Sequence, residues 1–155
     1  MSASIRYRFT QKFPYPPKAA FDWCTDFAPQ DHTLMGDPNA ERKVIPMSKG
    51  VLILDEVFHT PNGDVLKQKL VTLYPDRLSW VSTHLTGPNK HSQFTYQITP
   101  IKGGSQLEFT GLYIEYGKKL TAVEVKLLSE RFCKEDADAW GLLAAAMVKD
   151  LGKPA

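Results

Sequence analysis

The stretch from residue 121 to residue 151 reads TAVEVKLLSERFCKEDADAWGLLAAAMVKDL. It lacks proline, and its apolar residues recur at the spacing of one broad face of a helix. Thr121 and Glu124 have the spacing of a capping box, and Gly152 and Pro154 follow where a helix should stop. The stretch therefore predicts one long amphipathic helix over residues 121–151.

Short apolar segments alternate with turn-forming clusters over the middle of the chain. Five such clusters separate the segments: Lys49-Gly50, Pro61-Asn62-Gly63, Pro75-Asp76, Gly87-Pro88-Asn89 and Lys102-Gly103-Gly104. Strands are predicted between and beside them, near residues 40–48, 51–59, 64–74, 77–86, 91–100 and 105–116. Because these connections leave no room for crossover helices, the strands are predicted to form an antiparallel meander.

The N-terminal region predicts one more strand and two short helices. Apolar side chains alternate with polar ones in the first segment, which predicts a half-buried strand through Ile5, Tyr7, Phe9 and Phe13. A proline-rich loop ends this strand. Residues 18–27 then have helical spacing, and Pro29 ends or kinks this helix. Residues 30–38 predict a short helical turn followed by a loop.

In this order the elements predict an α+β fold in a single domain over residues 1–155. A curved antiparallel sheet of about seven strands is expected to wrap around the long C-terminal helix, with two short helices after the first strand. A curved sheet that grips a helix often leaves a gap, and a ligand would bind in that gap.

Composition excludes several classes of protein. The chain is 43% hydrophobic and 23% charged, which is ordinary for a globular protein, and its net charge of +2 predicts no nucleic-acid partner. No apolar run approaches the ~18 residues of a membrane span. We therefore expect a cytoplasmic protein, monomer or homodimer, without integral membrane association. Cys24 and Cys133 stand far apart without neighbouring ligands, so no disulfide, metal site or cofactor is predicted.

Two stretches resemble the START-like, birch-pollen-allergen-like superfamily, the SRPBCC or helix-grip proteins. Residues 13–23, FPYPPKAAFDW, look like its strand-to-helix connection, where a proline-punctuated loop precedes a helix with an aromatic pair. Residues 96–108, YQITPIKGGSQLE, look like its penultimate hairpin with a glycine-rich turn. The resemblance implies the helix-grip fold over nearly the whole chain. It leaves function open, because the superfamily includes lipid and hormone binders, polyketide cyclases and dehydratases, coenzyme Q chaperones and co-chaperone modules.

Pairing across the turns divides the sheet side chains between two faces. One face collects Val51, Ile53, Asp55, Val57, His59, Leu66, Gln68, Leu70, Thr72, Val81, Thr83 and Leu85. The opposite face collects Leu52, Leu54, Glu56, Phe58, Lys67, Lys69, Trp80 and His84. Because two lysines on one strand belong in water, the first set is predicted to line the concave wall. A bulge at Gly63 would reverse the strand before it.

Polar groups on this wall are the candidates for ligand contact. The predicted binding residues are Asp55, Val57, His59, Gln68, Leu70, Val81, Thr83, Tyr96, Tyr113, Leu143 and Met147. Asp55 and His59 lie on one face of one strand and are the candidate catalytic pair for proton transfer. In the alternative, Asp55 bonds a neighbouring strand or an arginine, and His59 sits at the wet rim beside its turn.

Several other polar residues and the two cysteines are weaker candidates for the site. His32, next to Asp31 in the loop at the expected cavity mouth, is read as an exposed loop histidine, with gating or acid–base work as the alternative. The charges of the last helix are read as a solvated face, from which Glu130 or Asp136 could reach inward. Cys24 and Cys133 are read as small buried side chains.

Three functions follow from these interpretations. The first is binding of a small hydrophobic ligand, as carrier or sensor, in a cavity between the sheet and the C-terminal helix. The second is an enzyme of the polyketide cyclase or dehydratase kind that uses Asp55 and His59. The third is a co-chaperone-like interaction module, for which Trp80, Phe58 and Leu54 would form an exposed patch on the outer sheet face.

Overall fold

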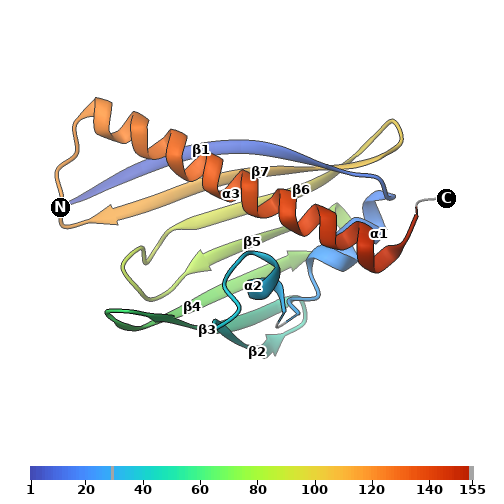
Figure 1. Ribbon diagram of the computed structural model, residues 1–155, viewed down its shortest axis with the longest axis horizontal. Coiled ribbons are helices and arrows are strands. Elements are labelled where there is room, and N and C mark those ends of the chain that lie inside the picture. The colour runs from blue at the N-terminus through green and yellow to red at the C-terminus, as the bar shows by residue number, and fades with distance from the viewer. Residues whose placement is uncertain (29, 154–155) are drawn as a thin grey trace.

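Seven antiparallel strands form one sheet, and a long helix crosses its concave face in the computed structural model (Figure 1). The strands are β1 (Ser2–Phe13), β2 (Glu41–Ser48), β3 (Val51–Thr60), β4 (Gly63–Tyr74), β5 (Ser79–His84), β6 (Gln93–Ile101) and β7 (Gly104–Tyr116), in the spatial order β1-β7-β6-β5-β4-β3-β2. The structure describes residues 1–28 and 30–153, so the predicted helix ends at Pro29 and Pro154 lie outside the described residues. The predicted meander and helix-grip fold are confirmed.

The helices also follow the prediction. They are α1 (Pro17–Cys24), α2 (Asp31–Leu34) and α3 (Ala122–Leu151), with one turn of 3-10 helix, η1 (Pro75–Arg77), between β4 and β5. The capping box of α3 is present: the Thr121 hydroxyl accepts from the Glu124 backbone N–H at 3.2 Å, and the Glu124 carboxylate accepts from the Thr121 N–H at 2.7 Å. None of the helices in the described ranges is both long and apolar enough to cross a membrane.

The registers confirm how side chains are divided between the two sheet faces. Val57 pairs with Leu66 and so shares its face as predicted, and no bulge interrupts the pairing of β3 with β4. Leu70 pairs with Thr83, and Thr72 pairs with Val81, so these four residues share one face as predicted.

The predicted concave wall is wrong, because the other face lies inside. Leu54, Val71 and Trp80 are no more than 3% exposed, whereas Leu66 on the opposite face is 64% exposed. Lys67 and Lys69 therefore point inward. Lys69 does so because Glu56, on the neighbouring strand, is buried on the same face and supplies a negative charge, whereas Lys67 lies over the ring of Phe58. The proposed outer patch of Trp80, Phe58 and Leu54 is wrong for the same reason.

One end of the interior is close-packed. Under α1 and the last turns of α3, a buried apolar cluster includes Phe13, Phe21, Trp80, Leu107 and Met147. The edge of Phe21 meets the Trp80 ring at 5.8 Å between centroids. This cluster joins the sheet to both helices. It does not extend to the other end of the interior, toward the β5–β6 loop.

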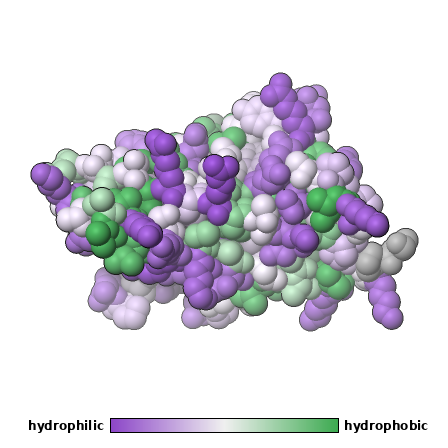
Figure 2. Space-filling model, turned by 90° about the horizontal axis from the view of Figure 1, so that it is seen from above, coloured by the Kyte–Doolittle hydropathy of each residue, from purple (hydrophilic) through white to green (hydrophobic). Residues whose placement is uncertain are grey.

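The surface seen from above is predominantly polar. On that side, apolar residues appear in separate groups, divided by charged and polar ones (Figure 2). On this side, therefore, the apolar residues do not form one continuous patch.

Candidate functional site

A hollow of about 340 Å³ lies between the concave face of the sheet and the middle of α3. A smaller hollow of about 120 Å³ adjoins it toward α1 and α2, and the two share Lys69, Ser82, Tyr96 and Trp140. Aromatic side chains from three strands (β1, β6 and β7) and α3 form much of the larger wall: Tyr7, Phe94, Tyr96, Phe109, Phe132 and Trp140. We call this larger hollow the cavity.

Tyr96 lies at the boundary between the cavity and the packed end. Its ring stacks on Trp80 with centroids 4.7 Å apart and meets Trp140 at 5.9 Å. Burial raises the pKa of its hydroxyl, so the group is a neutral phenol. No hydrogen bond to this hydroxyl is found among the described residues. The phenol is therefore available to a molecule in the cavity.

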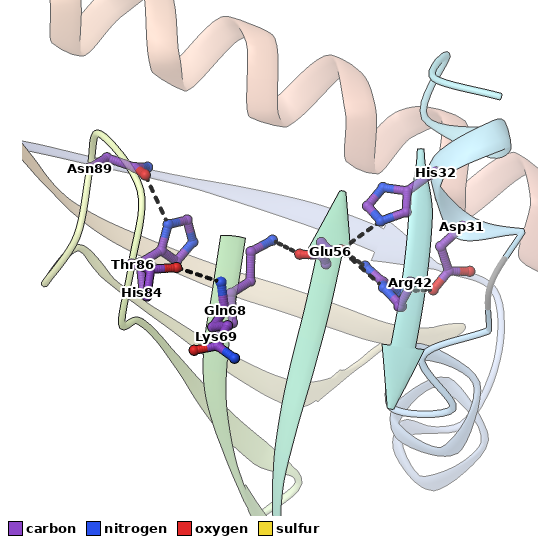
Figure 3. A network of polar contacts seen from close by, with 9 residues as sticks. All are labelled: Asp31, His32, Arg42, Glu56, Gln68, Lys69, His84, Thr86 and Asn89. Carbon is purple, nitrogen blue, oxygen red and sulfur yellow. Dashed lines mark hydrogen bonds and ion pairs between the residues drawn. The ribbon is translucent and has the colours of Figure 1, made fainter. Parts of the chain in front are cut away.

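A buried carboxylate organises the charged side of the interior. Glu56 is 1% exposed, and its carboxylate contacts Lys69 at 2.5 Å, His32 at 2.5 Å and Arg42 at 2.9 Å (Figure 3). Burial alone would raise the pKa of Glu56, but the contact with His32 and the charges of Lys69 and Arg42 outweigh it and hold the pKa well below its usual range. Glu56 is therefore an anion inside the fold.

The same network attaches α2 to the sheet. Arg42 donates to Asp31 at 3.0 Å while also donating to Glu56, so a residue of α2 and a residue of β3 share one guanidinium. His32 is 5% exposed and lies edge-on to Phe58. The interpretation of His32 as an exposed loop histidine is wrong, because α2 folds back over the sheet and turns this ring inward.

The Glu56 carboxylate does not use all of its hydrogen-bonding capacity. Neither Glu56 Oε1 nor His32 Nε2 makes a hydrogen bond of acceptable angle in the described structure, although both lie at ion-pair distance from their neighbours. The contacts are therefore mainly electrostatic, and Lys69 keeps N–H donors that Glu56 does not use.

His84 stands beside Lys69 as its direct cross-strand partner. Burial, together with the nearby charge of Lys69, lowers the pKa of His84 to about 4, so the ring is neutral at neutral pH. Its Nδ1 lies 3.2 Å from Asn89 Oδ1 (Figure 3). We infer that Nδ1 carries the proton and donates to Asn89, which leaves Nε2 as an acceptor.

The opposite wall carries two acids of α3, Glu135 and Asp136. Asp136 accepts a hydrogen bond from the Tyr7 hydroxyl, and burial raises the pKa of both groups. Tyr7 fits there because its partner on β7 is Gly111: a Cβ at Gly111 would lie 2.8 Å from the Tyr7 ring. The prediction of a solvated face is thus wrong for Asp136, which follows the alternative of reaching inward, whereas Glu130 is exposed.

The predicted site residues are distributed between the two sheet faces. Tyr96, Tyr113 and Leu143 line the hollows, and Met147 is buried in the packed end. The remainder belong to the outer face: Asp55, Val57, His59, Gln68, Leu70, Val81 and Thr83. His59 is exposed and contacts Asp64 at 2.7 Å and Glu41 at 3.2 Å, as in the wet-rim alternative. The Asp55–His59 pair is therefore not in the cavity.

Four residues of the interior were not predicted as site residues: Glu56, Lys67, Lys69 and His84. The available signal was that these four share a face with Trp80, a residue poorly suited to a solvated surface. No group of three or more histidine, cysteine, aspartate or glutamate side chains within residues 1–28 and 30–153 is arranged to hold a metal ion.

Comparison with known proteins identifies the fold. No protein-family model matches the sequence, and no curated protein matches it. Among solved structures, TTHA0849 from Thermus thermophilus superposes with a TM-score of 0.77 at 13% identity, over 95% of this chain and 99% of that one.

Two further structures match similarly. The Zhui aromatase/cyclase from a Streptomyces species gives a TM-score of 0.73 at 12% identity, over 98% of this chain and 97% of that one. Ara h 8.0201 gives 0.70 at 10% identity, over 95% and 99%. The chain therefore has the helix-grip fold of the START-like, birch-pollen-allergen-like superfamily.

Proposed function

We propose that this protein binds a small, predominantly aromatic molecule in the cavity between the sheet and α3. The observation that carries the proposal is a hollow of about 340 Å³ whose wall combines several aromatic rings with a few convergent polar groups. Ligand sites typically have volumes of about 300–1,000 Å³ and this kind of lining. Flat rings would stack on or meet Tyr96, Phe94 and Phe132 edge-on.

The polar groups support binding of a ligand in one orientation. The free Tyr96 hydroxyl can donate, the inferred Nε2 of His84 can accept, and Lys69 lies beside His84 on the sheet wall. Such groups cost free energy when buried without partners, so a ligand that bonds to them would relieve that cost. The name of one solved neighbour, the Zhui aromatase/cyclase, also supports a small molecule in this part of the fold.

The two other hypotheses depended on residues that do not lie where each hypothesis requires them. The enzyme hypothesis used Asp55 and His59, and these lie on the outer face. The interaction-module hypothesis used Trp80, Phe58 and Leu54 as one exposed patch, and Trp80 and Leu54 are buried. Ligand binding is the function for which the observed interior supplies both the space and the contacts.

The test is titration with N-phenyl-1-naphthylamine, an uncharged aromatic probe that becomes fluorescent in apolar sites. The variant Ala139→Trp places an indole in the cavity, because Ala139 lies on its α3 wall. We expect probe affinity to fall at least about tenfold, a change of about 1.4 kcal/mol. The control is Ala145→Trp, which adds the same ring at an exposed position of the same helix.

Two results would contradict the proposal. One is the absence of saturable probe binding to the wild-type protein. The other is an equal effect of the two tryptophan variants, since a probe on the outside of α3 would not distinguish Ala139 from Ala145. Thermal unfolding of both variants confirms that each is folded during the titration.

A further inference from the structure

One positive charge in the interior is left without an ion-pair partner. Lys67 lines the cavity from β4, and its ammonium lies 5.1 Å from the centre of the Phe58 ring. No carboxylate in the described part of the chain lies within 4.0 Å of its Nζ. Burial and the neighbouring charge of Lys69 lower the pKa of Lys67, which shows that the present surroundings disfavour its charged form.

The nearby carboxylates already have other partners. Glu56, directly opposite Lys67 in the register, contacts Lys69, His32 and Arg42. Asp31 is held by Arg42. Asp136 lies on α3 and accepts from Tyr7. The sheet wall of the cavity is therefore the positive side, and the helix wall is the negative side.

We propose that the cavity selects an aromatic anion, a carboxylate, sulfonate or acidic phenolate, whose charged group lies at the ammonium groups of Lys67 and Lys69. This inference rests on the proposed function and adds the charge of the ligand to it. An anion there would give Lys67 the counter-charge that it lacks and would accept the N–H donors of Lys69 that Glu56 leaves unused. Hydrogen bonds between charged groups are shorter and about twice as strong as neutral ones.

The arrangement also determines how the ligand is oriented. The anionic group points to the sheet at β4, and the ring system extends along the aromatic wall toward Phe94 and Phe109. The reverse orientation would bring the anion to Asp136 and would be repelled. His84 adds no charge at neutral pH, so it does not compete with the two lysines for the anion.

The experiment compares two probes that share one aromatic body. 1-Anilinonaphthalene-8-sulfonate carries a sulfonate, and N-phenyl-1-naphthylamine lacks it. We expect the wild-type protein to bind the sulfonate about tenfold more tightly than the uncharged probe, and the ratio of the two affinities to fall to about one in Lys67→Gln. Because both affinities are measured on the same variant, an effect of the substitution on the shared aromatic body cancels in this ratio. Lys67→Arg retains the positive charge and should retain the preference.

The matched control is Lys102→Gln, which removes the same charge from the exposed β6–β7 turn. It should leave the preference intact, because a general effect of the net charge would act equally at both positions. Binding of the uncharged probe without any preference for the sulfonate would overturn the inference and leave the proposed function standing. Failure of the wild-type protein to bind either probe would overturn the proposed function itself. An equal loss of preference in the two glutamine variants would also overturn the inference.

Discussion

At the end of the interior covered by α1, the space between the sheet and α3 is filled by apolar side chains, whereas toward the β5–β6 loop the same space is hollow and charged. The two ends share one sheet face and one helix. At the filled end, Trp80, Leu107 and Met147 are at most 2% exposed. At the hollow end, Lys67 and Trp140 are only partly buried.

The two ends contribute differently to the stability of the fold. Close apolar packing stabilises a fold in proportion to the area it removes from water. A buried charge cluster such as Glu56, Lys69 and Arg42 contributes little net stability, because removing charges from water costs about as much as their attraction returns. The hollow end is therefore explained better by a ligand than by the requirements of folding.

The largest expected effect concerns the filled end. Trp80→Ala should lower the free energy of unfolding by about 3–5 kcal/mol, because it leaves a void between α1 and the sheet. Phe132→Ala, at the half-buried edge of the cavity, should cost less than half as much. Urea unfolding of both variants measures the contrast. Equal losses would show that the two ends are packed alike.

A smaller effect is expected from pH at the hollow end. The pKa of His84 is about 4 in the folded protein, against 6.5 for an ordinary histidine, so the unfolded chain binds the extra proton first. The part of the free energy of unfolding that depends on a neutral His84 is thus present above about pH 6.5 and is lost as pH falls toward 4. The loss between pH 6.5 and about pH 5 should be roughly 2 kcal/mol.

The variants His84→Gln and His91→Asn sharpen this test. His84→Gln removes the buried titrating ring and should make the free energy of unfolding less dependent on pH over this range. His91→Asn removes an exposed imidazole and should leave the dependence as in the wild type. Urea unfolding at several pH values measures both. A wild-type pH dependence in His84→Gln would show that another group is responsible.

The smallest effect is expected on the outer face. The double variant Asp55→Asn with His59→Gln should bind N-phenyl-1-naphthylamine within about twofold of the wild-type affinity, because both side chains lie across the sheet from the cavity. The same fluorescence titration measures it. A loss as large as that of Ala139→Trp would mean that the ligand binds on the outer face.

Local patterns were sufficient for most of the fold. The proline-free apolar periodicity of residues 121–151 and the turn clusters predicted α3 and the six middle strands to within a few residues. The alternation of side chains also predicted correctly which residues share a face, because a strand has a period of two whatever surrounds it.

Which face lies inside depended on contacts between distant parts of the chain. Considered alone, Lys67 and Lys69 indicated that their face of the sheet is exposed to solvent. The face became an interior once β3 placed Glu56 beside Lys69, β2 placed Arg42 on Glu56, and α2 turned His32 onto the same carboxylate. The sequence by itself determined the elements, their order and the division of side chains between faces. Only the tertiary structure decided which of those faces is the site, because burial of a charge depends on the partners that folding brings to it.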